Sequence, residues 1–217
     1  MPESRNPAKV WQEMLRGNKR FIDGEPAHPR QDVERRTEVA FAQNPDAALF
    51  GCSDSRLAAE IIFDKGIGDL FVVRNAGQII SESVVGSLEY AVGVLNVPLI
   101  VVLGHDECGA VRAAIDSQGP DAEALPPHIN NLIAKIVPAV RRVGGTPAGG
   151  PGSTTIDPAT VDSHAVGREH LRDTIAELLE ESELISDAVA AGTLAIVGAN
   201  YRLLEGRAVP DIAVGSV

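Results

Sequence analysis

Two cysteines and one histidine are the residues of this chain whose types and spacing could do chemistry. Cys52 ends the stretch AALFGC, and His105 and Cys108 stand three positions apart in GHDECGAV. Two thiolates and an imidazole are three zinc ligands, the number that a catalytic site uses while a fourth tetrahedral position stays open. Free cysteine is also among the most buried residue types and packs as a small hydrophobe. His105 and Cys108 alone therefore leave a metal site and ordinary core as alternatives.

Charged residues follow Cys52 directly, in the stretch GCSDSR. Asp54 and Arg56 lie just past an apolar run, where ionised groups must be paired or coordinated to offset their desolvation. Their spacing allows them to pair with each other. Such a pair either serves the chemistry beside Cys52 or is a salt bridge that fixes a loop.

Four short apolar runs predict the strands that must position these residues. The runs are continuous rather than alternating, which is typical of parallel strands buried on both faces; they cover residues 47–52, 69–74, 98–104 and 194–200. Helical patterns separate them. The sequence therefore predicts an α/β fold with a mostly parallel central sheet of four to five strands, flanked by helices. The last eight residues, PDIAVGSV, predict an edge strand or a tail.

Cys52 and His105 each close a predicted strand, and in open α/β sheets that carboxyl edge is where sites are built. The 53 positions between them allow the chain to return to the same edge. Cys108 would lie at the first turn of a helix that begins around Gly109, where free backbone amides favour the thiolate.

The length of 217 residues indicates a single domain over 1–217. Residues 1–25 are expected to form a helical arm, in which the amphipathic helix 7–23 could pack on a neighbouring subunit. Residues 144–153 are rich in glycine and proline and are expected to be a flexible loop.

The formal net charge of −11 argues against a nucleic-acid or anionic-membrane surface, because phosphate binding relies on clustered Lys and Arg. No targeting segment and no apolar stretch of spanning length is evident. We expect a cytoplasmic protein that has no nucleic-acid or membrane partner and keeps its two cysteines as thiols.

The pattern C-x-D-x-R at a strand end, followed about fifty residues later by H-x-x-C, resembles the β-class carbonic anhydrases. The resemblance covers roughly residues 8–115 and 165–205, including CSDSRLAAEIIFDKGIGDLFVVRNAG. It implies a zinc ion held by Cys52, His105 and Cys108 in an enzyme that reversibly hydrates carbon dioxide to bicarbonate and a proton. Ionised Asp54 would orient the nucleophile, and Arg56 would keep Asp54 ionised and oriented.

The resemblance also implies a substrate pocket. Phe71 and Tyr90 match its apolar wall, the backbone amide of Gly109 lies close to the zinc, and Gln43 reaches the substrate from the neighbouring subunit of a homodimer or homotetramer. Each aromatic residue could instead be core, and Gln43 a solvated loop residue. The other four histidines, including His164 and His170, are expected on the surface with no role.

Three other functions stay open. A hydrolase of carbonyl sulfide or carbon disulfide on the same fold would need the same zinc chemistry with a different lining at Phe71, Ala76 and Tyr90. A binding protein could hold zinc in a site closed by Asp54. A Cys52 nucleophile with His105 as its base is the fourth alternative.

Overall fold

A five-stranded sheet forms the centre of the computed structural model, which describes residues 6–144 and 156–217. Its order is β2-β1-β3-β4-β5. The strands are β1 (Ala47–Cys52), β2 (Leu70–Asn75), β3 (Leu99–His105), β4 (Ala195–Arg202) and β5 (Arg207–Val214). The first four run parallel, and β5 pairs antiparallel with β4. The predicted α/β fold is therefore confirmed, and the chain end contributes an edge strand rather than a tail.

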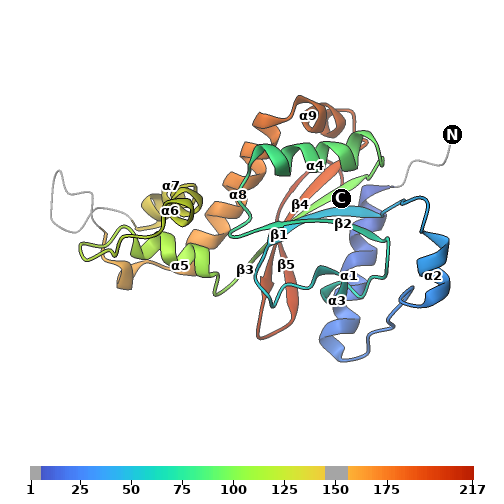
Figure 1. Ribbon diagram of the computed structural model, residues 1–217, viewed down its shortest axis with the longest axis horizontal. Coiled ribbons are helices and arrows are strands. Elements are labelled where there is room, and N and C mark those ends of the chain that lie inside the picture. The colour runs from blue at the N-terminus through green and yellow to red at the C-terminus, as the bar shows by residue number, and fades with distance from the viewer. Residues whose placement is uncertain (1–5, 145–155) are drawn as a thin grey trace.

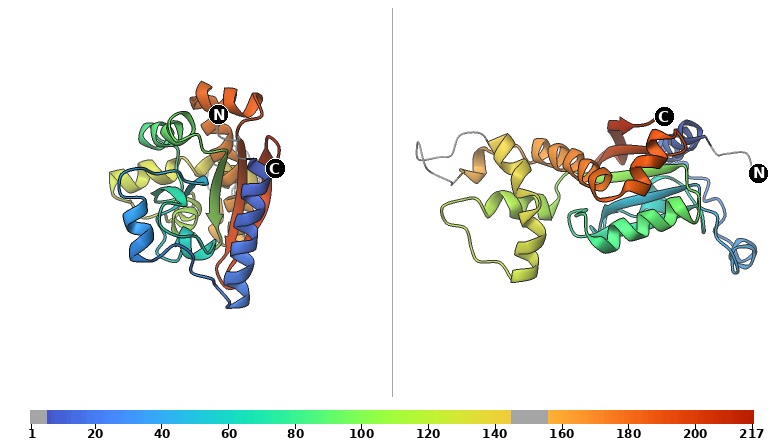
Figure 2. Two further views of the ribbon diagram at one scale, coloured as in Figure 1. Left: turned by 90° about the vertical axis from the view of Figure 1, so that its right-hand side faces the viewer. Right: turned by 90° about the horizontal axis from the view of Figure 1, so that it is seen from above.

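Helices cover both faces of this sheet. One face packs against α1 (Pro7–Asp23) and α3 (Ala59–Ile62), and the other against α4 (Glu82–Gly93), α8 (Ser163–Glu181) and α9 (Glu183–Ala190). Figure 2 shows α1 and α4 on opposite sides of the strands. Alternate residues of β1 enter different cores, Leu49 with α1 and Phe50 with α4, which explains why the strand is apolar at every position.

The N-terminal helix α1 is built into its own chain. Asn6 caps its start through a hydrogen bond from the Lys9 amide, and Gly24, at a φ of 74°, ends it in the left-handed conformation. Its buried side chains include Trp11, whose ring lies 6.5 Å from that of Phe63. Its buried apolar side chains therefore pack against the sheet of the same chain, and the packing of this helix on a neighbouring subunit stays a prediction.

The remaining helices lie at the ends of the molecule. They are α2 (Val33–Glu38), α5 (Gly109–Asp116), α6 (Pro127–Ala134), α7 (Val137–Gly144) and the short 3-10 helix η1 (Pro158–Thr160). Figure 1 shows α5, α6 and α7 as a lobe beyond the end of the sheet, beside the start of α8. Of the loop predicted at 144–153, all but Gly144 lies outside the described residues.

The long helical stretch before β4 breaks in two at Ser182. That residue has extended backbone angles, ends α8 and caps α9 by accepting a hydrogen bond from the Ile185 amide. Its hydroxyl also donates to Glu89 of α4 at 2.7 Å. None of the described helices is long and apolar enough to cross a membrane.

Candidate metal centre

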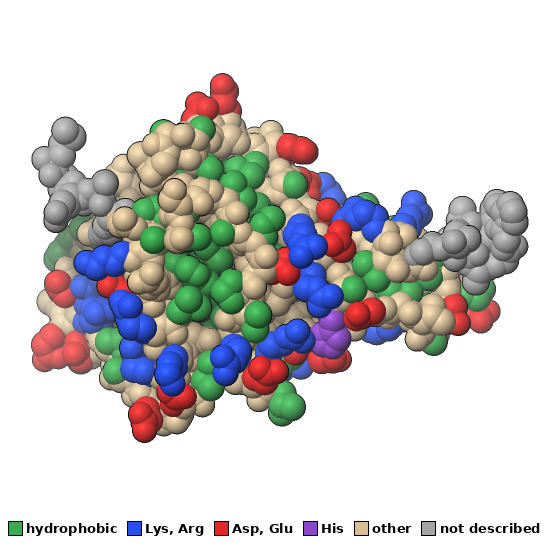
Figure 3. All heavy atoms as spheres, turned by 180° about the vertical axis from the view of Figure 1, so that it is seen from behind, with side chains coloured by type: hydrophobic (Ala, Val, Ile, Leu, Met, Phe, Trp, Pro, Cys, Tyr) green, Lys and Arg blue, Asp and Glu red, His purple; other side chains and the backbone are tan. Residues whose placement is uncertain are grey.

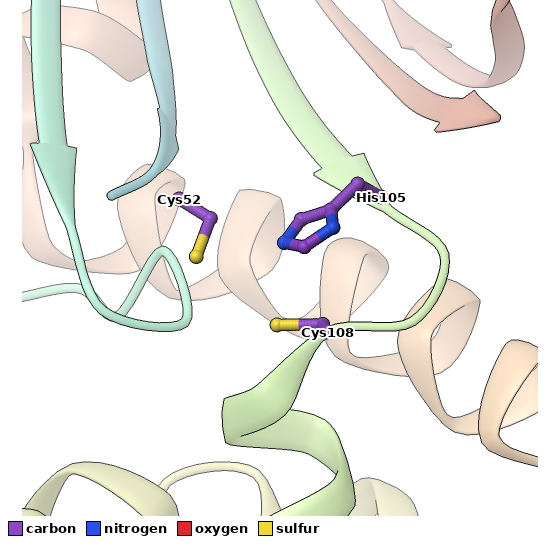
Figure 4. A group of neighbouring side chains, drawn as sticks. All are labelled: Cys52, His105 and Cys108. Carbon is purple, nitrogen blue, oxygen red and sulfur yellow. The ribbon is translucent and has the colours of Figure 1, made fainter. Parts of the chain in front are cut away.

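The three predicted ligands meet at the point in the sheet where the strand order reverses. After β1 the chain crosses to β2 on one side, and then returns to β3 on the other side of β1, so the carboxyl ends of β1 and β3 form a topological switch point, where α/β sheets build their sites. Cys52 is the last residue of β1, His105 is the last of β3, and Cys108 caps α5. Their ligand atoms all lie within 4.8 Å of one another, and Figure 4 shows the side chains pointing toward a common centre.

His105 presents one ring nitrogen to this centre. Its Nδ1 lies 2.8 Å from the carbonyl oxygen of Asp106, and because a carbonyl only accepts, Nδ1 carries the proton. Nε2 therefore has a free lone pair. It is buried and has no hydrogen-bond partner in the described part of the chain, in a residue only 5% exposed. A buried polar atom without a partner is costly, and a metal ion at the centre would supply the partner that Nε2 lacks.

The two thiols shift each other's pKa in opposite directions. A hydrogen bond from Cys108 is the main cause that lowers the pKa of Cys52, with a smaller contribution from the Gly77 amide, while burial acts in the opposite direction. The Cys52 thiolate, together with burial, raises the pKa of Cys108. The pair thus shares a proton that a divalent cation would displace. Two thiolates and a neutral imidazole fit zinc, so the residues present match this metal.

Asp54 and Arg56 form a two-point ion pair next to Cys52. The Arg56 Nε donates to Oδ1 of Asp54 and Nη2 to Oδ2, both at 2.8 Å, and the backbone amide of Arg56 also donates to Oδ1 at 2.9 Å. This arrangement holds the pKa of Asp54 well below its usual range. Because Nη2 also donates to the carbonyl oxygen of Glu107, the same guanidinium joins the loops after β1 and β3.

Arg74 holds the backbone that carries these groups. Its Nε donates to the carbonyl oxygen of Cys52 at 2.9 Å, and its Nη2 to that of Asp54 at 2.7 Å. The backbone at the end of β1 is therefore fixed at both Cys52 and Asp54.

The four residues expected at the substrate pocket fall into two places. Gly109 starts α5 directly after Cys108, and a side chain there would meet no atom within 4 Å, so open space adjoins its backbone. Phe71, by contrast, pairs with Ala48 near the start of β1, and its ring lies 6.1 Å from that of Tyr90. Gln43 lies before β1 and lines a shallow hollow with Tyr90.

Gln43, Phe71 and Tyr90 therefore lie together near the amino edge of the sheet, whereas the metal ligands lie at the carboxyl edge. A six-residue strand spans roughly 20 Å, so the two groups are well separated within one chain. The structure brings Cys52, Asp54, Arg56, His105, Cys108 and Gly109 together, and it leaves these three residues apart from them.

His170 is a residue that the sequence reasoning misplaced. It was expected on a polar surface of its helix, yet it is 4% exposed and its Nε2 lies 2.7 Å from the carbonyl oxygen of Gly77. The signal that could have found it is the spacing of four along α8, since Val166, Thr174 and Leu178 are all buried on the same stripe. His164, six positions earlier, is partly exposed as expected and lies 3.8 Å from Glu107.

Fold and site together define a class: an α/β protein with a thiolate, imidazole and thiolate centre at the switch point of its sheet and an arginine-held carboxylate beside it. The profile of the carbonic anhydrase family matches residues 47–208. Carbonic anhydrase 2 of Mycobacterium tuberculosis strain H37Rv is 44% identical over 220 residues, which cover 100% of this chain and 98% of the relative. Carbonic anhydrase of Mycolicibacterium smegmatis is 45% identical over 207 residues, covering 95% and 94%.

Solved structures share the fold at lower identity. A tetrameric β-carbonic anhydrase of Sordaria macrospora superimposes with a TM-score of 0.69 at 21% identity, covering 95% of this chain and 100% of the other. A Coccomyxa β-carbonic anhydrase in complex with acetazolamide gives 0.69 at 22% identity, covering 94% and 87%.

The chain belongs to the carbonic anhydrase family, in its β class. It is a carbonate dehydratase, a zinc enzyme for the reversible hydration of carbon dioxide.

Proposed function

We propose that Cys52, His105 and Cys108 hold the catalytic zinc and that Asp54, positioned by Arg56, orients the reacting water. The observation that carries this proposal is the buried Nε2 of His105, which has no partner in the described residues and faces the two thiols. When bound, zinc lowers the pKa of a coordinated water toward neutrality and so supplies a nucleophile.

Asp54 is suited to orienting the reacting water because its carboxylate is ionised and keeps a free hydrogen-bond acceptor position. An ionised carboxylate accepts hydrogen bonds and donates none. Oδ1 receives two hydrogen bonds from Arg56 and Oδ2 receives one, so Oδ2 keeps a lone pair for the reacting water. A water whose proton points at Oδ2 turns its own lone pair away from the carboxylate and toward the carbon of carbon dioxide.

The same ion pair favours the open site over a zinc-binding protein closed by Asp54. A carboxylate that moved to the metal would give up both guanidinium hydrogen bonds, and Arg56 would lose its partner. Two charged hydrogen bonds of good geometry oppose that movement.

The substrate pocket requires a second copy of the chain in this proposal. Gln43, Phe71 and Tyr90 offer an apolar wall and one amide donor, which suits a small apolar molecule such as carbon dioxide. Within one chain they lie far from Cys52, and Tyr90 is 44% exposed. We therefore assign these residues, Gln43 most clearly, to the site of a neighbouring subunit, and Gly109 to the site of its own chain.

A homodimer or homotetramer follows from that assignment. Large apolar side chains are exposed at several places, and Figure 3 shows an apolar area on the face opposite that of Figure 1, with basic side chains and some acidic ones below it and at its sides. Apolar areas of this kind mark association surfaces. The Sordaria macrospora relatives are described as tetrameric, which supports the same expectation.

The cellular compartment of this enzyme is inferred from its cysteines. Cys52 and Cys108 are both free thiols, which fits a reducing cytoplasm. We also propose that residues 1–217 act as one domain, since the N-terminal helix shares a core with the sheet.

Stopped-flow hydration of carbon dioxide on zinc-quantified protein, at pH values between about 6.5 and 9, tests the proposal. One zinc per chain, with activity that rises through this range, is the expected result. Stoichiometric zinc with no hydration at any pH would contradict it and would direct the next assay to carbonyl sulfide.

A further inference from the structure

The turn after β2 makes direct contact with a metal ligand. The Gly77 amide donates to Sγ of Cys52 at 3.3 Å, which is within hydrogen-bond distance for sulfur. Gly77 has a φ of +82°, and a Cβ there would come within 2.9 Å of the Ala110 side chain. Only glycine fits this position without strain, so the turn is shaped to bring its backbone against the thiolate.

The start of this turn is fixed by Asn75. Its side-chain oxygen accepts from the Ile79 amide at 2.8 Å, and its side-chain nitrogen donates to the Ile79 carbonyl at 2.7 Å. These two bonds close the loop at its ends but make no contact with Gly77 itself.

The middle of the turn is held from α8. His170 is buried, its Nε2 lies 2.7 Å from the carbonyl oxygen of Gly77, and its Nδ1 has no partner in the described residues. Because a carbonyl only accepts, Nε2 carries the proton and donates it. Burial lowers the pKa of His170, which keeps the ring neutral in this arrangement.

We infer that His170 is a positioning residue for the zinc site, which acts on Cys52 through Gly77. By fixing the Gly77 carbonyl, His170 holds the turn in the orientation that directs the Gly77 amide at the Cys52 thiolate. Hydrogen bonds to a ligand set its orientation and its charge, so losing this one weakens the hold on the metal. The inference rests on the proposed function in one respect, that Cys52 is a zinc ligand.

A histidine that merely fills the core would behave differently. Its contribution would depend on volume, and an apolar side chain of similar size would replace it with no effect on the metal. A positioning role depends instead on one N–H donor at the place of Nε2. The side-chain amide of glutamine can put a donor near that place, whereas leucine has none and asparagine carries its amide one carbon shorter.

The experiment measures zinc release from the full-length, zinc-loaded protein into excess chelator, for His170→Leu, His170→Asn and His170→Gln, with His164→Gln as the matched control on the same helix. We expect release to be about 10-fold faster for His170→Leu and His170→Asn. His170→Gln should stay within about threefold of the parent protein, and His164→Gln should not change. In the cobalt-substituted proteins, the sulfur-to-metal absorption band should move in the first two variants only.

Equal release rates for His170→Gln and His170→Asn would overturn the inference, as would parental rates in a folded His170→Leu. If His170→Leu does not fold, the comparison of the glutamine and asparagine variants still decides the question. A parent protein that binds no zinc would contradict the proposed function instead, so the two failures are distinguishable.

Discussion

The two edges of the sheet differ in how their side chains are held. At the carboxyl edge Cys52, His105, Cys108 and Asp54 each have a hydrogen-bond partner or a close neighbour from the same chain. At the amino edge the Tyr90 ring lies against that of Phe71 but is 44% exposed, and Phe41, which lines the same hollow, is fully exposed. Buried polar groups need partners, and one chain supplies them at the metal; exposed aromatic groups are covered only by another molecule. In the proposed assembly, a single chain therefore brings the metal-binding group together and a second chain completes the pocket.

The largest effect, a loss of zinc binding, is expected when one of the proposed ligands at the carboxyl edge is replaced. Cys108→Ser replaces a soft thiolate ligand by a hydroxyl that stays protonated, so zinc affinity should fall by more than the roughly 10- to 100-fold that loss of an outer partner costs. Hydration activity should fall with it. Zinc content after dialysis against chelator measures the loss, and a variant that keeps full zinc and full activity would remove Cys108 from the ligand set.

Asp54→Ala, at the same edge, tests the orientation of the reacting water separately from metal binding. Zinc content should stay at the parental level, because Asp54 pairs with Arg56 and not with the metal group. Turnover should fall by about 100-fold, the cost of a misplaced reactant. Glu60→Ala, which removes an exposed carboxylate on the nearby α3, is the control. Parental turnover in Asp54→Ala would contradict the orienting role.

Mixed subunits test whether the amino edge serves another chain. Gln43→Ala should lower kcat/KM by about 10-fold with zinc retained, since one hydrogen bond is lost. Coexpressed with Cys108→Ser, it should recover activity, because a mixed dimer contains one site with both Cys108 and Gln43. Each variant alone gives the baseline. Mixed protein no more active than the average of the two variants would place Gln43 outside the shared site.

The smallest effect is expected on stability, from Asp64, which holds the segment that leads to Gln43. Asp64 has no exposed side-chain surface; it accepts from Arg20 at 2.6 Å and from the amides of Ala27 and His28 at 2.9 and 3.0 Å. Burial alone would raise the pKa of Asp64, but these donors together lower it. Asp64→Asn should reduce the free energy of unfolding by about 1–3 kcal/mol at pH 7.

The pH dependence of that loss has a definite sign. Because the folded pKa of Asp64 is lowered, its contribution is present above the unfolded value near 3.9 and fades as the pH falls through the folded value. Urea unfolding at pH 7 and at decreasing acid pH should show the difference between parent and variant narrowing. The exposed Asp23→Asn is the control; a pH-independent difference would contradict the charge-based explanation.

Local patterns were sufficient for the strands, and with the family resemblance they predicted the Cys52, His105 and Cys108 group that the structure brings together. Continuous apolar runs placed β1 and β3 within a residue of their observed bounds, and the position of Cys52 and His105 at strand ends followed from them. Local sequence patterns did not predict two features of the helical stretch before β4. The stretch around Ser182 keeps a helical composition although the chain breaks there to let α9 pack on the sheet, and His170 looked polar although its stripe is buried.

The amino-acid sequence by itself determined which residues could act as donors, Cys52, His105 and Cys108, that Asp54 and Arg56 could pair, and the sheet edge where these residues meet. These features depend on residue type and on strand ends, which are local properties. Only the tertiary structure decided which nitrogen of His105 faces the two thiols, that His170 supports the Gly77 turn, and that Phe71 and Tyr90 lie at the far edge. Each of these depends on strand register and on packing between segments distant along the chain, which no local pattern records.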